Sequence, residues 1–486
     1  MERSSGVLMH ISSLPGKYGC GDFGEGARKF IDTIAECGFT YWQVLPFCVP
    51  DEYASPYSSM STFSGNPYFI DLEELHCRGL LTDEELSSAV QNTPYSCEFA
   101  RLANERLPLL LRAAERASTD QVLKAEIYGF MKHNPRVSEF CLFMAKRSAN
   151  GGKCWTEWTT ERFDDEVLFA WEFIQYEFFT QWEKVKKYAN SHGIRVIGDI
   201  PFYVALDSSD VWGSREQFLL DSDGRPEWVA GVPPDYFSED GQLWGNPLYN
   251  WKQMNADGYS FWRDRLSFML SLFDGIRIDH FRAIESYYAI PGDAETAREG
   301  KWRRGPGLKF AKMIKDIAGN RLIIAEDLGD DTEKARVLIG KCGFRGIRVM
   351  QFGFTSGNDT YHRPHSFPNV CAAYTGTHDN NTLLGCVYEM SPECRRELFD
   401  YCGCPEDFDA ACVQIIRTLM ESPAGLVILP VQDILGFGAD TRMNRPGIGE
   451  GNWGFRITYD QLSSVNCQRY RRMNGLYGRV VTHNGI

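Results

Sequence analysis

The chain has 486 residues, of which 43% are hydrophobic and 24% are charged, which is typical of a soluble globular protein. Its formal net charge of −14 repels phosphate backbones and anionic lipid surfaces, so we expect no nucleic-acid partner and no membrane-bound role. The basic run Lys301–Arg304 is too short to offset this charge. No apolar segment approaches the ~20 residues that span a bilayer, and the N-terminus lacks a secretory apolar core, which predicts a cytoplasmic enzyme.

Eight apolar stretches rich in strand-forming residues recur along the chain and end in glycine, proline or polar residues. Helical patterns fall between most of them, for example over Gly26–Cys37. This alternation predicts an α/β fold, a (β/α)8 TIM barrel, with an open doubly wound sheet as the competing layout. The expected strands are Gly6–Ile11, Thr40–Pro46, Ile194–Asp199, Gly275–His280, Leu322–Asp327, Ile347–Gly353, Ala373–Asn380 and Gly425–Pro430.

Two connections between the expected strands are much longer than a crossover helix requires. The first, over residues 63–190 approximately, is rich in Leu, Ala, Glu and Arg in its middle part and predicts a mainly helical insertion between strands 2 and 3. The second, over residues 207–251 approximately, is dense in Gly, Pro, Trp and Tyr, which suits a substrate-binding loop more than a core element. With no repeat or flexible linker, residues 1–486 are expected to form a single catalytic unit.

Fifteen cysteines are scattered through the chain, and none is spaced as Cys-x-x-Cys. An odd number without this spacing does not indicate a disulfide framework or a zinc site. We therefore expect mostly buried free thiols in a reducing compartment.

The segment Gly19–Gly24 matches the dinucleotide fingerprint Gly-x-Gly-x-x-Gly literally. Seven residues separate it from the preceding strand, and the next expected strand ends without the carboxylate that would hold a ribose. A nicotinamide or flavin cofactor is therefore not expected. The close pair His362 and His365 has a proline beside it, which favours a loop role over a metal site.

Three of the expected strands end in a carboxylate, namely Asp279, Glu326 and Asp379. Carboxyl ends of parallel barrel strands meet at one edge, where glycosidic-bond cleavage needs an acid to protonate the leaving oxygen and a carboxylate to trap the sugar carbon. Arg277 and Asp279 are two apart on a strand and share a face, so we expect the guanidinium to keep the pKa of Asp279 low, as a nucleophile requires. Glu326 follows an apolar run, which suits a general acid/base. Asp379, with His378 beside it, is placed to hold sugar hydroxyls.

Each carboxylate also has a structural interpretation. Asp279 alone fits a buried salt-bridge partner of Arg277, and Glu326 or Asp379 alone fits a helix cap that follows its strand. Their shared position at strand ends favours chemistry over three separate structural roles.

The strings around these residues resemble the 4-α-glucanotransferases called amylomaltase or disproportionating enzyme, a branch of the α-amylase clan. Further matching strings run nearly from end to end of the chain, and the longest is Gly231–Pro247. The strings that carry the resemblance are Gly275–Arg282, Ile324–Gly329, Thr375–Asn380, Ser12–Pro15, Gly19–Gly24, Ser55–Tyr57, Gly65–Tyr68, Gly198–Pro201 and Arg442–Gly447.

The resemblance implies roles for these residues: Asp279 as the nucleophile that forms a β-glucosyl-enzyme, Glu326 as the acid/base and Asp379 as the transition-state stabiliser. It also implies that α-1,4-glucan segments move from a donor glucan or maltooligosaccharide to the 4-hydroxyl of an acceptor glucan or glucose, without a cofactor and without a metal. The expected substrate-binding residues are Arg277, His280, His378, Tyr57, Asp235, Tyr236, Phe237, Gln242 and Trp244.

The chain departs from the family pattern at Ala283–Ile284, Ile448 and Phe455, which leaves the charged groups intact and bears on acceptor preference more than on the reaction. Two alternatives stay open: a hydrolase on the same barrel, in which water reaches the intermediate first, and a non-catalytic glucan-binding protein that kept the groove. A monomer or weak homodimer is expected.

Overall fold

The computed structural model describes residues 3–50, 54–234, 239–329, 332–355 and 360–480. Eight strands form a closed barrel in the order β1-β12-β11-β10-β9-β6-β3-β2, and all neighbouring strands with a described register are parallel. The predicted (β/α)8 barrel is therefore confirmed, and the open sheet is not. The barrel strands are β1 (Ser4–Leu8), β2 (Tyr41–Gln43), β3 (Arg195–Ile200), β6 (Gly275–Ile278), β9 (Leu322–Ala325), β10 (Arg345–Val349), β11 (Cys371–Tyr374) and β12 (Leu426–Pro430).

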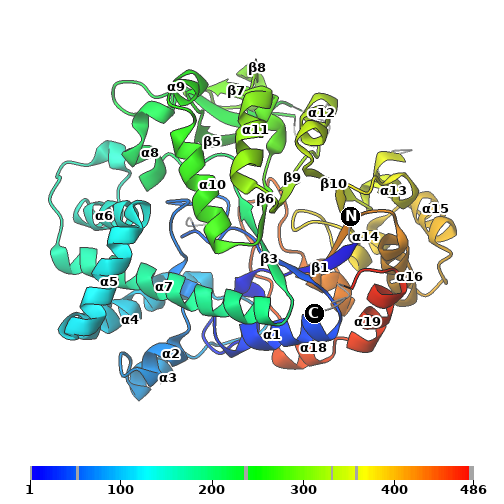
Figure 1. Cartoon of the computed structure of the whole chain (residues 1–486), viewed down its shortest axis with the longest axis horizontal. Coiled ribbons are helices and arrows are strands. Elements are labelled where there is room, and N and C mark those ends of the chain that lie inside the picture. The colour runs from blue at the N-terminus through cyan, green and yellow to red at the C-terminus, as the bar shows by residue number, and fades with distance from the viewer. Residues whose placement is uncertain (1–2, 51–53, 235–238, 330–331, 356–359, 481–486) are drawn as a thin grey trace.

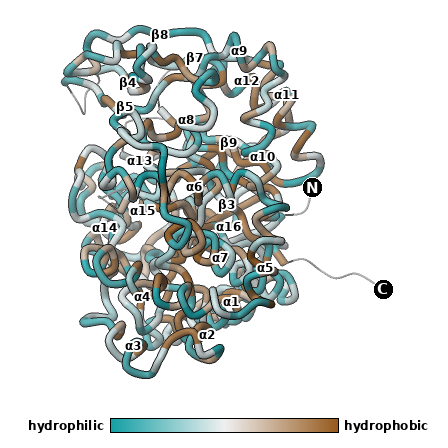
Figure 2. The backbone as a smooth tube through the Cα atoms, turned by 90° about the vertical axis from the view of Figure 1, so that its left-hand side faces the viewer, coloured by the Kyte–Doolittle hydropathy of each residue, from teal (hydrophilic) through white to brown (hydrophobic). Residues whose placement is uncertain are grey.

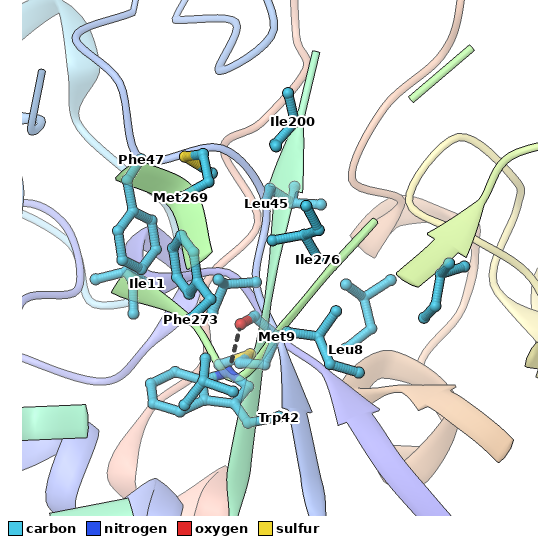
Figure 3. Close-up of a cluster of buried hydrophobic side chains, with 14 of the residues drawn as sticks. Leu8, Met9, Ile11, Trp42, Leu45, Phe47, Ile200, Met269, Phe273 and Ile276 are labelled. Carbon is cyan, nitrogen blue, oxygen red and sulfur yellow. Dashed lines mark hydrogen bonds between the residues drawn. The ribbon is translucent and has the colours of Figure 1, made fainter. Parts of the chain in front are cut away.

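The strands are apolar almost throughout because both of their faces are covered, by the barrel interior and by the helices outside. Figure 3 shows part of this core, where side chains from β1, β2, β3, β6 and the preceding helix α10 (Ser260–Leu272) meet. Trp42 is fully buried there and donates its indole N–H to the Met9 carbonyl at 2.7 Å, which satisfies the single polar group of the ring.

Helices surround the barrel, and several segments between consecutive strands carry more than one (Figure 1). Hydrophobic stretches of the backbone gather toward the interior, whereas much of the outer chain is hydrophilic (Figure 2). Within the described part of the chain, no helix combines the length and apolar character that crossing a membrane demands. The helices outside the β2–β3 and β3–β6 connections are α1 (Glu25–Glu36), α11 (Gly307–Ala318), α12 (Glu333–Cys342), α13 (Phe352–Thr355), α14 (Leu383–Glu389), α15 (Pro392–Cys402), α16 (Phe408–Glu421), α17 (Val431–Leu435), α18 (Tyr459–Ser463) and α19 (Cys467–Leu476).

The connection between β2 and β3 contains a group of helices that lies to one side of the barrel (Figure 1). The longest, α7, packs against α4, α5 and α6 and leads into β3. The helices of this group are α2 (Leu72–Cys77), α3 (Asp83–Ser88), α4 (Phe99–Thr119), α5 (Gln121–His133), α6 (Pro135–Ala149) and α7 (Asp165–Ser191).

A second, four-stranded sheet in the order β5-β4-β7-β8 was not expected from the sequence. Its strands come from the connections that follow β3 and β6, and the pairs are antiparallel. The segment expected to be a loop over residues 207–251 therefore contains the strand pair β4–β5, and the basic run Lys301–Arg304 is one of the two edge strands of this sheet. The elements are α8 (Ser209–Gly213), β4 (Trp228–Val232), β5 (Gln242–Pro247), α9 (Trp251–Ala256), β7 (Ser286–Pro291) and β8 (Lys301–Arg304).

The first and last barrel strands pair along a seam, from Ser4 opposite Leu426 to Leu8 opposite Pro430. Arg479, which is fully buried, donates from this seam to the carbonyls of Met420, Ser4, Ala424 and Ser422 at 2.7 to 3.0 Å. Burial lowers the pKa of this guanidinium to about 9. The cation thus satisfies carbonyls at the end of α16 and at the entry of β1 that have lost contact with water.

We expect Arg479→Met to destabilise the protein by on the order of 3 kcal/mol, because several buried carbonyls lose their donor while the methionine fills much of the space. Denaturant midpoints of the variant and the wild type measure this loss. Arg472→Met, at an exposed position of the helix that precedes Arg479, is the matched control and should change little. Equal midpoints for Arg479→Met and wild type would contradict the role of Arg479 in satisfying these four carbonyls.

Candidate functional site

The carboxyl ends of β3, β6 and β9 bring acidic side chains together around Arg277. The backbone ladders place them: the N–H of Asp279 donates to Ile200 at 3.0 Å, and the N–H of Glu326 donates to Ile278 at 3.1 Å. Asp279 and Glu326 thus sit just beyond adjacent strands of one barrel edge, as expected.

Arg277 binds three carboxylates at once and is only 3% exposed. Its Nη1 atom donates to both oxygens of Asp199, at 2.8 and 2.7 Å. Its Nη2 atom lies 2.9 Å from Asp279 Oδ1 and 3.1 Å from Glu326 Oε2. Because the same nitrogen contacts both oxygens, their separation cannot exceed the sum of these two distances.

The turn after β6 aims a second donor at Glu326. His280 has a φ of 44°, in the left-handed region that residues other than glycine rarely adopt. In this conformation its backbone N–H donates to Glu326 Oε2 at 2.7 Å. Glu326 therefore has polar contacts from Arg277 and His280, although the strand that precedes it is buried on every residue except Leu322. Burial and the nearby Arg282 lower the pKa of the His280 ring to about 3, so the imidazole is neutral.

Asp379 lies in a turn beyond β11 and not directly at the strand end, because β11 finishes at Tyr374. Asn444 donates to Asp379 Oδ1 at 2.6 Å, and Arg442 donates to the Asp379 backbone carbonyl at 2.6 Å. The His378 ring lies 3.3 Å from Asp379 Oδ2. The turn is therefore fixed from the segment that follows β12.

Several of these side chains border a cleft of about 1060 Å³. Of the expected residues, Tyr57, Gln242, Trp244, Asp279, His280, His378 and Asp379 line it, while Arg277 and Glu326 do not. Aromatic rings form part of its wall: Tyr57 stacks on His378 with centroids 5.1 Å apart, and Trp244 meets His280 edge-on at 4.9 Å. Asp235, Tyr236 and Phe237, which are expected to bind substrate, lie outside the described residues.

Three further residues of the site, Asp199, Asn444 and Arg442, were not predicted as site residues. Asp199 is fully buried and also accepts a hydrogen bond from the Tyr57 hydroxyl at 2.8 Å, so it connects the cleft wall to Arg277. The sequence does contain a pattern that indicates Asp199, because the expected strand Ile194–Asp199 ends in this carboxylate, as other expected strands end near Asp279, Glu326 and Asp379. Among the described residues, no group of three or more His, Cys, Asp or Glu side chains is arranged to hold a metal ion.

The expectation that Arg277 keeps the pKa of Asp279 low is wrong. Burial raises the pKa of Asp279 from 3.8 to about 7, Arg277 opposes this rise, and the adjacent Glu326 adds to it. One guanidinium shared by three carboxylates does not offset their loss of water and their mutual repulsion. The pKa of Asp199 is raised as well, mainly by burial and against the effect of Arg277.

A closed parallel barrel with carboxylates converging at its carboxyl edge is the architecture of a barrel enzyme. A family model described as 4-alpha-glucanotransferase matches residues 9–462. The 4-alpha-glucanotransferase of Streptococcus pneumoniae is 38% identical over an alignment of 496 residues, gaps included. The alignment covers 99% of this chain and 98% of that protein. The 4-alpha-glucanotransferase of Thermus thermophilus is 39% identical, and the match covers 97% of this chain and 98% of that protein.

Among solved structures, the amylomaltase from Streptococcus agalactiae in complex with acarbose is 34% identical and superposes with a TM-score of 0.94. The match covers 99% of this chain and 100% of that one. The chain therefore belongs to the 4-alpha-glucanotransferase family and is an enzyme of that type.

The raised pKa of Asp279 predicts a pH-dependent stability. Between its ordinary value of 3.8 and about 7, the folded protein keeps a proton that the unfolded chain has lost, so stability falls as the pH rises through this range. Well above pH 7, Asp279 is ionised in both the folded and the unfolded state, and the loss of stability has reached its full size. We expect Asp279→Asn to be more stable than wild type by roughly 1–2 kcal/mol at pH 8, with the difference shrinking toward pH 4.

Urea midpoints of both proteins at pH 5, 6, 7 and 8 measure this difference. Asp316→Asn, at an exposed position, controls for the loss of one negative charge. A difference between Asp279→Asn and wild type that is the same at every pH would show that Asp279 is already ionised at pH 5.

We expect Asp199→Asn to lower kcat/KM for glucan transfer by about 100-fold, because Arg277 loses a bidentate charge-assisted contact and with it the position that it gives to Asp279 and Glu326. A positioning role predicts that kcat falls much more than KM rises. Tyr57→Phe removes only the hydroxyl donor to Asp199 and should cost less than about tenfold. Equal losses in the two variants would contradict this order.

Proposed function

We propose that this enzyme transfers α-1,4-glucan segments from a donor to the 4-hydroxyl of an acceptor glucan or glucose by a retaining double displacement, with Asp279 as nucleophile, Glu326 as acid/base and Asp379 as stabiliser. The single observation that carries the proposal is the contact of one Arg277 nitrogen with both Asp279 and Glu326. This shared contact keeps the two oxygens closer together than roughly 6.5 Å, the smallest separation of the two carboxyl groups in inverting enzymes. Retaining enzymes hold their two carboxyls about 5 Å apart, which agrees with this limit.

In the first step, Glu326 gives a proton to the glycosidic oxygen while Asp279 attacks the anomeric carbon from the opposite face. The bond to the leaving glucan breaks, and a β-glucosyl ester forms on Asp279. Burial raises the pKa of Asp279 to about 7, so this carboxyl group is only partly ionised at neutral pH and must lose its proton before it attacks. The guanidinium of Arg277, 2.9 Å from Asp279, is the charge that supports the ionised form.

In the second step, Glu326 takes the proton of the acceptor 4-hydroxyl, whose oxygen attacks the anomeric carbon and releases Asp279. The double inversion returns the α-linkage. The N–H of His280 and the guanidinium of Arg277 hold the Glu326 carboxylate in place for both steps. Water would give hydrolysis at this point, so the outcome depends on whether a sugar occupies the acceptor side of the cleft.

Asp379 is suited to stabilise the positively charged sugar ring between these steps. Its carboxylate lines the cleft and is oriented by Asn444, and the neighbouring His378 ring is held by stacking on Tyr57. The aromatic face of Trp244 and the amide of Gln242, which accepts the indole N–H at 3.1 Å, offer an apolar surface and a polar anchor for further sugar rings. Acarbose bound to the amylomaltase from Streptococcus agalactiae supports a sugar ligand in such a cleft.

The remaining expectations stay predictions. They are a single catalytic unit over residues 1–486 with insertions at about 63–190 and 207–251, binding of substrate by Asp235, Tyr236 and Phe237, independence from any cofactor, a cytoplasmic location, and a monomer or weak homodimer.

Incubation with maltotriose alone tests transfer. We expect a ladder of longer maltooligosaccharides together with glucose and maltose, because each glucosyl-enzyme is discharged by another sugar. Glucose and maltose without longer products would instead support the hydrolase alternative.

Asp279→Asn tests the non-catalytic alternative in the same assay. We expect turnover to fall by at least about 10⁴-fold, because the covalent intermediate cannot form, while circular dichroism reports an intact fold. If the wild-type protein binds maltooligosaccharides without any turnover, the result would support the non-catalytic glucan-binding alternative.

A further inference from the structure

The last described helix, α19, packs across the end of the first barrel helix, α1, at the amino edge of the barrel. Arg471 donates its Nε–H to the Glu36 carbonyl at 2.7 Å, and the Asn474 amide donates to the Cys37 carbonyl at 3.0 Å. Asn474 also accepts the Ser5 hydroxyl at 2.5 Å. Side chains of α19 therefore satisfy carbonyls that α1 leaves open at its C-terminus.

Cys467 shares the helix face of Arg471 and Asn474, since residues four and seven positions apart lie on one side of an α-helix. Its sulfur lies 2.7 Å from the sulfur of Cys37, although the two residues are 430 positions apart in the sequence. The Cys467 thiol also lies 3.5 Å from the Thr33 carbonyl of α1. The same contacts that cap α1 thus hold the two thiols together.

A disulfide bond has a sulfur–sulfur length of about 2.05 Å, so these atoms need to approach by well under 1 Å. Both backbones are fixed near the bond: Cys37 is the C-cap residue of α1, and Cys467 begins α19 behind the N-cap Asn466, whose side chain accepts from Arg469. The remaining approach therefore falls to the two side chains, since the caps hold both backbones in place.

We propose that Cys37 and Cys467 are a site of oxidative modification, at which a low-molecular-weight disulfide converts the two thiols into an intramolecular disulfide that joins α1 to α19 across the barrel seam. This site is separate from glucan transfer. It lies before β2 and after β12, at the barrel edge opposite the carboxylates.

The exchange takes place in two balanced steps. Cys37 is 1% exposed and Cys467 is partly exposed, so the reagent meets Cys467 first. The Cys467 thiolate attacks one sulfur of the reagent, forms a mixed disulfide and expels one thiol. The Cys37 thiolate then attacks Cys467 Sγ and expels the second thiol. The protein loses two protons and two electrons, and the reagent is reduced to two thiols.

The surroundings set the rate of this exchange. Burial raises the pKa of both thiols, and Arg471 opposes this rise for each of them. The thiolate fraction at neutral pH is therefore small, so the pair reacts slowly and stays reduced unless oxidant persists.

Oxidised glutathione is the probe for the chemistry. The folded protein is incubated with it, remaining thiols are alkylated, and peptides are mapped by mass spectrometry without reduction. We expect one cross-linked species that joins the peptides of Cys37 and Cys467. Recovery of both residues as alkylated thiols, or of a stable glutathione adduct on Cys467 without cross-linking, would overturn the proposal.

The thermal midpoint supplies an independent readout. A bond between residues 430 positions apart restricts the unfolded chain strongly, so we expect oxidation to raise the melting temperature by roughly 3 °C. The rise should be absent in Cys467→Ser and in Cys37→Ala, and transfer activity should stay within about twofold in all forms. A rise that persists in Cys467→Ser would assign the effect to another pair.

Cys402→Ser is the matched control. Cys402 and Cys404 are two residues apart at the end of α15, and a bond between them would close a loop too short to join separate elements. We expect this variant to behave as wild type in both measurements. Loss of the Cys37–Cys467 cross-link in Cys402→Ser would show that the bond forms by relay and would also contradict direct formation.

Discussion

The binding of three carboxylates by the single buried guanidinium of Arg277 is the constraint on which the rest of the site depends. It fixes Asp279 and Glu326 relative to each other, and through Asp199 it reaches Tyr57 and the stacked wall of the cleft. The charges do not balance, since three potential anions share one cation. The site therefore holds a proton that the unfolded chain would release, and the ionised form of Asp279 lowers the free energy of unfolding.

The barrel supplies this arrangement because its parallel strands bring sequence-distant residues to one edge. Asp199 pairs in register with Arg277, and Arg277 with Ile324, so the residues that follow these strands must be neighbours. The chain after β12 then returns over the same edge, where Arg442 and Asn444 hold the turn of Asp379. The small sheet β5-β4-β7-β8 adds the wall that carries Trp244.

The barrel was predictable from the sequence because buried parallel strands are apolar on both faces and end abruptly at polar residues. The small sheet was not, because its strands are antiparallel and its edge strands β5 and β8 are exposed along much of their length and lack an apolar run. In β8, for example, Arg303 covers the ring of Trp228 at 3.8 Å, a contact that no local pattern indicates. Asp279 and Glu326 were placed correctly, but the pKa of Asp279 depends on burial and on a neighbour from another strand, which spacing alone does not reveal.

The seam between β1 and β12 has a consequence for how the molecule is made. Strand β1 leaves the ribosome before the other barrel strands. Three elements that stabilise it or the helix after it come from near the other end of the chain: its neighbour β12, the helix α19 that caps α1, and Arg479. The strands that carry the carboxylates can pair with their neighbours during synthesis, but the ring stays open until β12, which ends at Pro430, has emerged. Premature termination before β12 would therefore leave β1 with an unpaired edge, which is a template for aggregation.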